Sequence, residues 1–270
     1  MTIRLTDVWQ FPEGLSNYKV HFARWNKFDQ PLEILLRSQD EWRAWQEWRP
    51  RRDEFNRAFI FTLAQFYHET DVWLFGGVYR VVARHADRYE VALTDQGAGF
   101  IRRLKIFSPY RSRATRVNLE RNLPKFEVQE VLREPYSGRA FPGYEEIDLS
   151  FEELEALVRN NRPDWKAALE SVKGVYLISD ELTGKRYVGS AIGDSGIWSR
   201  WCTYAFSGHG GNVELRTLAT DPSLDYCRRA FRFSLLEHRS RLISDETVLV
   251  RESFWKRVLL TRGAQGLNRN

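Results

Sequence analysis

Two tyrosines in a predicted hairpin are the first residues of this chain whose type and spacing suit chemistry. Tyr176 lies in a short apolar run, 174–178, and Tyr187 lies in a second run, 185–190, after a polar turn rich in Asp, Thr and Gly. Two such runs around such a turn are typical of a β-hairpin. If the strands pair across the turn, both phenol hydroxyls point into one cleft. The alternative is that the two rings only pack across the ladder, since Tyr is a common strand residue.

Further polar side chains follow the hairpin along the chain. Arg200 and Tyr204 stand four positions apart in a predicted helix, 195–206, so they share one helix face. The other candidates downstream are His209 and Asn212 in a glycine-rich loop, Glu252 in a predicted helix from 245 to 260, and Asn268.

This order of residues resembles that of the GIY-YIG nuclease family. Gly174-Val175-Tyr176 stands in the place of the first family tripeptide and Tyr187-Val188-Gly189 in the place of the second, each with Val where the family name has Ile. The resemblance extends from Lys173 to Asn268. It implies a small three-stranded sheet flanked by helices and an endonuclease whose catalytic residues are Tyr176, Tyr187, Arg200, Tyr204, Glu252 and Asn268.

Hydrolysis of a phosphodiester requires an activated water, stabilisation of negative charge on the phosphate, and help for the leaving oxygen. Glu252 offers one hard oxygen ligand, enough for a single Mg²⁺ or Mn²⁺ that also binds substrate phosphate. Arg200 can donate hydrogen bonds to the non-bridging oxygens. The alternative for both residues is a solvated surface charge.

By resemblance, Tyr176 is the general base or orients the water, and Tyr187 supports it. A phenol with a pKa near 10 is a poor base at neutral pH, so we expect Lys185, Arg186 or Arg200 to lower that pKa by stabilising the phenolate. The resemblance also assigns Tyr204 to the phosphate or the water and Asn268 to the phosphate or the structure of the site. His209 is a second candidate for proton transfer.

A cluster of positive charge lies in the first half of the chain, whose overall net charge is +5. Between Arg102 and Lys125 there are eight Arg or Lys residues and one acid, Glu120. A basic, turn-like loop suits contact with phosphates, and the alternative is a solvated loop balanced by acids elsewhere. The predicted DNA contacts are Arg102, Arg103, Lys105, Arg111, Arg113 and Arg116 here, with Lys185, Arg186, His209 and Asn212 near the catalytic residues.

The pattern along the chain predicts an α+β protein of two domains. Residues 1–150 contain about five strands with glycine-rich turns, which favours a small, barrel-like, mostly-β domain that recognises DNA. Ser150 and Glu153 form a capping box that begins a helix, and with a second helix after Pro163 it predicts a helical linker over 151–172. The nuclease-like domain follows, over 173–270.

The remaining features of the sequence exclude several classes of protein. Cys202 and Cys227 are not spaced as metal ligands, and we interpret them as reduced thiols of a cytoplasmic protein. Among the 270 residues there is no apolar run long enough to span a membrane, and the start of the chain has no signal-peptide core. We therefore expect no membrane partner.

Three functions agree with these observations. The first is a restriction endonuclease, active in antiphage defence, that cuts double-stranded DNA as a homodimer and whose first domain recognises a sequence or a modified base flipped into an aromatic pocket. The second is a homing, transposition or repair-type nuclease directed by DNA structure. The third is a catalytically inactive DNA-binding protein. RNA is a further possible substrate, because the catalytic residues do not indicate whether the substrate carries a 2′-hydroxyl.

Overall fold

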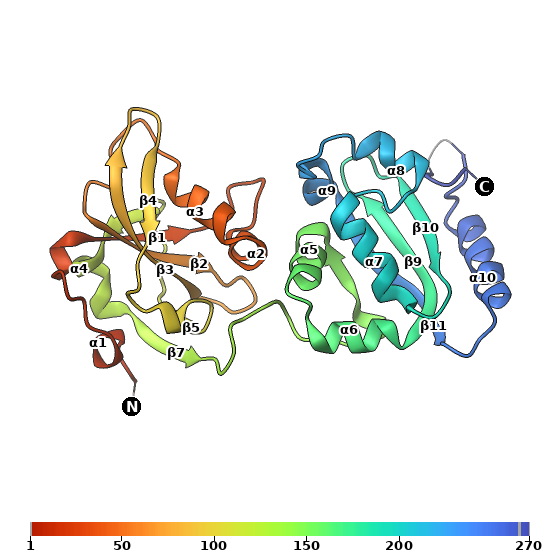
Figure 1. Cartoon of the computed structure of the whole chain (residues 1–270), viewed down its shortest axis with the longest axis horizontal. Helices are drawn as coiled ribbons and strands as arrows, with labels where there is room; N and C mark the ends of the chain where they lie inside the picture. Colours follow the sequence, from red (N-terminus) through yellow and green to blue (C-terminus); the bar gives the residue numbers. More distant parts are fainter. Residues whose placement is uncertain (1, 264–265, 270) are drawn as a thin grey trace. The chain divides into compact units, whose positions relative to one another are not determined.

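The computed structural model describes residues 2–263 and 266–269, and the chain divides into two compact units, Met1–Ser137 and Gly138–Asn270 (Figure 1). The division falls earlier than the predicted boundary at residue 150. We describe the two units separately and call them the first and the second unit.

The first unit is built on a curled, mixed seven-stranded sheet (Figure 1). Its strands follow the order β6-β1-β2-β3-β5-β7, and β4 pairs with β3. All pairs are antiparallel except β1 with β2. Because β6 and β7 stand at its two edges, the sheet is open where a barrel would be closed. The strands are β1 Tyr18–Ala23, β2 Phe59–Gln65, β3 Val72–Arg84, β4 Tyr89–Leu93, β5 Leu104–Phe107, β6 Arg116–Asn118 and β7 Glu127–Val131.

Two helices make the crossover that the parallel pair of β1 and β2 requires. α2 (Pro31–Arg37) begins with a proline at its first turn, and Ser38 caps α3 (Gln39–Glu47) by accepting the backbone N–H of Glu41. Trp42 of α3 is fully buried, and its indole N–H donates to the carbonyl of Gly76 at 2.9 Å. The unit also contains α1 Leu5–Val8, α4 Leu119–Asn122 and the 3-10 turns Leu15–Asn17, Ala98–Phe100 and Leu123–Lys125.

Aromatic side chains fill the core of the first unit. Phe61 and Phe75 pack at a centroid distance of 4.8 Å, and Trp9 meets both edge-on. Phe22 packs against Trp73 in the same cluster. The high aromatic content of this half therefore serves mainly to fill a core that a small curled sheet closes around.

The second unit contains a four-stranded antiparallel sheet in the order β10-β9-β11-β8, one strand more than predicted (Figure 1). The additional strand is β8 (Asp148–Ser150), which is three residues long and pairs with β11. The other strands are β9 Val172–Asp180, β10 Arg186–Ala191 and β11 Phe231–Ser240; the helices are α5 Phe151–Arg159, α6 Pro163–Glu170, α7 Gly196–Ser207, α8 Val213–Leu218, α9 Asp225–Ala230 and α10 Asp245–Val258, with a 3-10 turn at Tyr144–Glu146.

The predicted linker helices are part of this second unit. α5 begins at the capping box, in which Ser150 and Glu153 exchange both hydrogen bonds, at 3.1 and 2.8 Å. Leu154 of α5 and Trp165 of α6 are 1 % and 0 % exposed and belong to the same core as Tyr176. The helices carry apolar faces that need burial, so they pack on the sheet and do not form a free connection.

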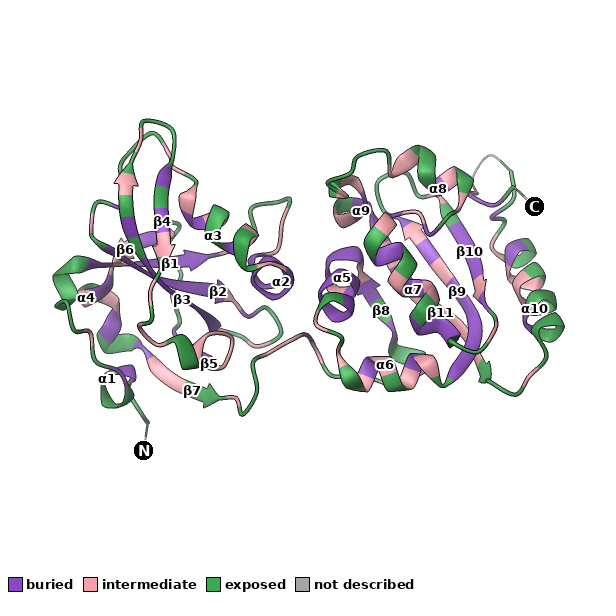
Figure 2. Ribbon diagram, in the orientation of Figure 1, coloured by how far each residue is buried: buried purple, intermediate pink, exposed green. Residues whose placement is uncertain are grey.

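The register of the hairpin decides which face each tyrosine occupies. Tyr187 pairs with Ile178 and Gly189 with Tyr176, so both tyrosines lie on the same face of the sheet. That face packs against α7, and the opposite face, with Val175 and Val188, packs against α10. Burial follows this arrangement, since β9 and β10 are buried along most of their length (Figure 2).

Over residues 2–263 and 266–269, no helix combines the length and the apolar character needed to cross a membrane.

Candidate active-site cleft

A guanidinium and two phenols form a buried cluster between α7 and β9. The hydroxyl oxygens of Tyr176 and Tyr204 are 3.1 Å apart. Arg200 donates from Nε to the hydroxyl of Tyr176 at 3.1 Å and from Nη2 to the hydroxyl of Tyr204 at 3.2 Å. Arg200 and Tyr204 lie one turn apart on α7, and Tyr176 comes from β9, the first strand of the hairpin and an inner strand of the sheet. Three residues that the sequence singles out are therefore in direct contact.

The position of Tyr176 depends on a glycine opposite it in the ladder. A Cβ atom at Gly189 would lie 2.5 Å from the hydroxyl of Tyr176 and 2.6 Å from its Cζ. Gly210 has the same relation to Tyr204, where a Cβ would lie 2.5 Å from Cε1 of the ring. The glycine of the second tripeptide thus makes room for the tyrosine of the first, which is a steric reason for that residue type.

Burial shifts the pKa values of Tyr176 and Tyr204 upward, whereas a lowered pKa was expected for Tyr176. Tyr176 and Tyr204 are both 0 % exposed. Removal from water raises the pKa of Tyr176, and the charge of Arg200 only partly offsets this effect. Burial likewise raises the pKa of Tyr204. Arg200 thus acts on the pKa of Tyr176 in the expected direction, but the net shift is upward, because desolvation exceeds the attraction of this cation.

An open cavity of about 600 Å³ lies beside this cluster, at the edge of the sheet formed by β10. Tyr187 from β10, Arg200 from α7 and Glu252 from α10 all line it. Its remaining wall comes from the segment 190–196, with Ser199 and Thr203 of α7. Three candidate residues from three different elements thus converge on one cleft.

Glu252 is one of two carboxylates that line this cleft, the other being Asp194, and two side chains hold Glu252 in place. Ser190 donates its hydroxyl to Oε2 at 3.1 Å, and the ammonium of Lys256 lies 3.2 Å from Oε1. The side chains of Glu252 and Lys256 are only 13 % and 6 % exposed. Sequence reasoning missed both partners, although Lys256 stands at the i+4 position from Glu252 and Ser190 directly follows the second tripeptide.

The donor set of the cleft fits one hard divalent cation whose other ligands are water and phosphate. Each oxygen of Glu252 keeps lone pairs beyond its contacts with Ser190 and Lys256. In the part of the chain that the structure describes, no three His, Cys, Asp or Glu side chains gather in a way that would hold a metal without substrate. Mg²⁺ is commonly bound by one or two carboxylates together with substrate phosphates.

Asn268 lies outside the cleft and fixes its edge strand. Its Oδ1 accepts the backbone N–H of Val188 at 3.0 Å, and its Nδ2 donates to the carbonyl of Val188 at 2.8 Å. Asn268 is only 6 % exposed. Of the two roles considered for this residue, the geometry favours the structural one, because its amide binds the backbone of β10.

The polar residues of the loop after α7 make contacts within that loop. Nδ1 of His209 accepts the backbone N–H of Gly211 at 2.9 Å, and burial, followed by the charge of Arg216, lowers the histidine pKa. Asn212 caps α8 by accepting the backbone N–H of Leu215 at 2.8 Å. Neither residue lines the cleft. Lys185 and Arg186 lie in the hairpin turn and at the start of β10, also outside the cleft.

The basic segment of the first unit is largely used for structure. Lys105 is buried, with its ammonium 2.6 Å from Glu69 and 3.0 Å from Glu130. Arg116 is buried and donates to the carbonyl of Trp48 at 2.9 Å. As placed here, these two cations are not available to DNA, which corrects the prediction for them.

The other four predicted DNA contacts of the segment differ in exposure. Arg103 is half-buried and donates to backbone carbonyls, among them that of Leu132 at 2.8 Å. Arg102 is half-buried, and burial lowers its pKa. Arg111 is exposed but forms an ion pair with Asp71. Arg113 is exposed and has no hydrogen bond or ion pair with another described residue, so among the predicted DNA contacts of this segment it is the one that is both exposed and unpaired.

No protein-family model, no curated protein and no solved structure matches this chain. The resemblance to GIY-YIG nucleases therefore rests on the residues and on the contacts described above.

Proposed function

We propose that the chain is a metal-dependent DNA endonuclease of the GIY-YIG type that hydrolyses phosphodiester bonds. The observation that carries this proposal is the convergence of Tyr187, Arg200 and Glu252 on one open cleft. A cation, a hard anionic ligand and a phenol around one cavity are the groups that phosphodiester hydrolysis requires. The hairpin with its two tripeptides, one helix on each face, supplies these groups from separate elements.

Arg200 is the residue we assign to the charge on the phosphate. Its two hydrogen bonds to Tyr176 and Tyr204 use Nε and Nη2, and the other N–H groups of the guanidinium are not used by any described residue. Its partners are neutral phenols, so they orient the guanidinium without cancelling its charge. A donor that is fixed before the substrate arrives needs no reorganisation when negative charge develops.

The three tyrosines have different roles in this proposal. Tyr187 lines the cleft, so we assign its hydroxyl oxygen to orient the attacking water by accepting a hydrogen bond. Tyr176 and Tyr204 are buried and stay protonated at neutral pH, so they position Arg200. Glu252 would hold Mg²⁺ or Mn²⁺, which supplies Lewis-acid stabilisation of the phosphate and the leaving oxygen when bound. Lys256 and Ser190 fix the orientation of Glu252.

The substrate we propose is double-stranded DNA, in a restriction or defence reaction. The cleft brings together one set of Tyr187, Arg200 and Glu252 per chain, so a cut through both strands by two such clefts favours a homodimer on DNA. Selection of the target would then fall to the first unit. The formal net charge of +5 agrees with a polyanionic partner.

The test is cleavage of matched unmodified, methylated and hydroxymethylated DNA in the presence of Mg²⁺, with an RNA duplex alongside. We compare the wild type with Glu252→Gln and with Glu246→Gln, which removes an exposed carboxylate from the same helix. We expect Glu252→Gln to abolish cleavage while DNA binding persists, and Glu246→Gln to cut like the wild type. Equal behaviour of all three proteins on every substrate would mean that the nuclease proposal is wrong.

A further inference from the structure

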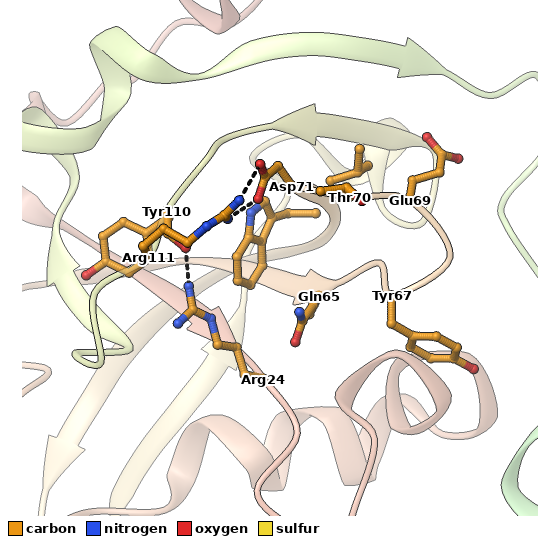
Figure 3. Close-up of a pocket in the computed structure, with 10 residues that line it drawn as sticks. Arg24, Gln65, Tyr67, Glu69, Thr70, Asp71, Tyr110 and Arg111 are labelled. Atoms are coloured by element: carbon orange, nitrogen blue, oxygen red, sulfur yellow. Dashed lines mark hydrogen bonds and ion pairs between the residues drawn. The ribbon is translucent and has the colours of Figure 1, made fainter.

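A second cavity, of about 430 Å³, lies in the first unit, where no catalytic residue has been placed (Figure 3). One wall is the turn between β2 and β3, from Gln65 to Trp73, and the other is formed by Arg24, Tyr110 and Arg111. Its size falls within the range of about 300–1,000 Å³ that is usual for small-molecule sites.

Two rings of this cavity are held rigidly from behind. Trp73 donates its indole N–H to the carbonyl of Ser108 at 3.0 Å. Tyr110 stacks on Phe22, with centroids 4.0 Å apart and an interplanar angle of 5°, and its hydroxyl donates to the carbonyl of Ala114 at 2.7 Å. Trp73 is only 2 % exposed and Phe22 covers one face of Tyr110, so the two rings form a rigid support for the side chain of Arg24.

Arg24 adds a planar cation beside these rings. Its guanidinium carbon lies 5.1 Å from the centroid of Trp73 and 5.3 Å from that of Tyr110. It donates to the carbonyls of Ser112 and Tyr110, and no described carboxylate forms an ion pair with it. The two acids of the wall are both neutralised, Asp71 by Arg111 and Glu69 by Lys105. The lining thus carries two cations and two carboxylates, and Arg24 is the cation among them that no described carboxylate pairs with.

Gln65 supplies hydrogen-bonding groups that the fold does not use. Its side chain lies between Arg24 and Tyr67 (Figure 3), and no described residue makes a hydrogen bond with its amide. Tyr67, on the far side of Gln65 from Arg24, is 39 % exposed, and its hydroxyl donates to Glu33 at 2.6 Å. An amide offers one acceptor beside donors, which matches the edge of a nucleobase.

We propose that this cavity binds a nucleobase, which stacks on the guanidinium of Arg24, presents its polar edge to Gln65 and is bounded by Tyr67 on the far side of Gln65. Base stacking on aromatic side chains or guanidinium planes and reading of the base edge are the usual means of holding an unstacked base. Arg113 lies in the same loop as Tyr110 and Arg111 and is free to contact a phosphate attached to that base. The base is carried either by DNA or by a free nucleotide, and only the first source rests on the proposed nuclease function.

The experiment uses the full-length chain in EDTA, so that cleavage does not interfere with binding. The probes are the mononucleotides dAMP, dGMP, dCMP, 5-methyl-dCMP and dTMP, measured by calorimetry, and fluorescein-labelled duplexes with cytosine, 5-methylcytosine or 5-hydroxymethylcytosine, measured by anisotropy. Gln65→Leu is compared with Gln129→Leu, which changes an exposed glutamine on β7. Tyr67→Ala is a second pocket variant, at a position that is 39 % exposed, and its folding is checked because it also removes the hydrogen bond to the buried Glu33.

We expect Gln65→Leu to weaken binding of at least one probe about tenfold, Tyr67→Ala to weaken the same probe, and Gln129→Leu to leave it unchanged. Loss on duplexes alone identifies a base carried by DNA, and loss on mononucleotides identifies a free nucleotide. If both pocket variants fold like the wild type and bind every probe as tightly, the proposal is overturned. Dependence of cleavage on Glu252 is measured separately, so either proposal can fail without the other.

Discussion

Arg200 of the second unit and two cations of the first unit are held in opposite ways. In the second unit, Arg200 is held by two phenols that carry no charge, and it lines an open cleft. In the first unit, Lys105 is held by two carboxylates and Arg116 by a backbone carbonyl and the carboxylate of Glu54, and both are buried. The comparison teaches that the partners of a cation, more than its presence in a basic stretch, decide whether its charge is available to a ligand.

The largest effect that would test this comparison concerns Arg200. We expect Arg200→Ala to reduce the single-turnover rate of DNA cleavage about a hundredfold to a thousandfold, because it removes a preorganised donor to the phosphate. Arg229→Ala, which removes an exposed arginine of α9, is the matched control and is expected to cut normally. Undiminished cleavage by Arg200→Ala, with the wild-type circular dichroism spectrum, would remove the cleft from consideration as the active site.

A smaller effect is expected when a buried cation of the first unit is removed. Arg116 lies 4.8 Å from the ring centroid of Trp48 and 4.6 Å from that of Phe55, and its side chain is 3 % exposed. Arg116→Met leaves the carbonyl of Trp48 without this donor, so we expect the free energy of unfolding to fall by about 2–3 kcal/mol in a urea titration.

Arg113→Met is the control for that prediction. Because Arg113 is exposed, we expect its replacement to leave the unfolding curve unchanged. It should instead lower DNA affinity and reduce the slope of log affinity against log salt by about 1. The opposite pattern, with Arg116→Met stable and Arg113→Met unstable, would contradict the structural role of the buried cations.

The smallest of the three effects is a dependence of the stability of the first unit on pH. Burial, followed by the charge of Arg116, lowers the pKa of His21 to about 3, whereas an unfolded chain titrates near about 6.5. Between these values the unfolded state binds more protons. The contribution of His21 to stability is therefore complete above about pH 6.5 and is lost as the pH falls towards 3.

We expect His21 alone to lower the free energy of unfolding by on the order of 1–2 kcal/mol between pH 7 and pH 5. His21→Gln, which can keep a hydrogen bond to Gln46, should flatten this part of the pH profile. Thermal melting of both proteins at the two pH values measures the difference. An equal loss in the variant would assign the pH dependence to other groups.

The sequence predicted best what depends on neighbouring residues. The capping box at Ser150, the hairpin from 174 to 190 and the helix with Arg200 were all expected, because caps, turns and helix faces are encoded within a few positions. The family resemblance also selected Tyr187, Arg200 and Glu252, which the fold brings to one cleft. These three residues are far apart in the sequence, so without the resemblance nothing in the sequence predicts that they meet in one cleft.

What the sequence did not predict depends on partners far along the chain. Lys105 and Glu69 are 36 positions apart, and Arg116 and the carbonyl of Trp48 are 68 apart, so the basic segment looked accessible. The sign of the pKa shift of Tyr176 depends on complete burial under α7, which the spacing of tyrosines does not report. The sequence does not predict strand β8, because so short a strand has too few residues to show a pattern. It predicts the helices α5 and α6 but not their packing, because an apolar helix face does not specify which element it packs against.

The contacts of Asn268 have a consequence for the behaviour of the protein at high concentration. β10 is an edge strand, and an exposed edge invites strand addition by another chain and aggregation. The amide of Asn268 occupies both backbone groups of Val188, and the N–H of Leu267 donates to the carbonyl of Arg186 at 2.9 Å. The same short segment that fixes the strand carrying Tyr187 therefore also blocks the edge of that strand against amyloid-like pairing between molecules.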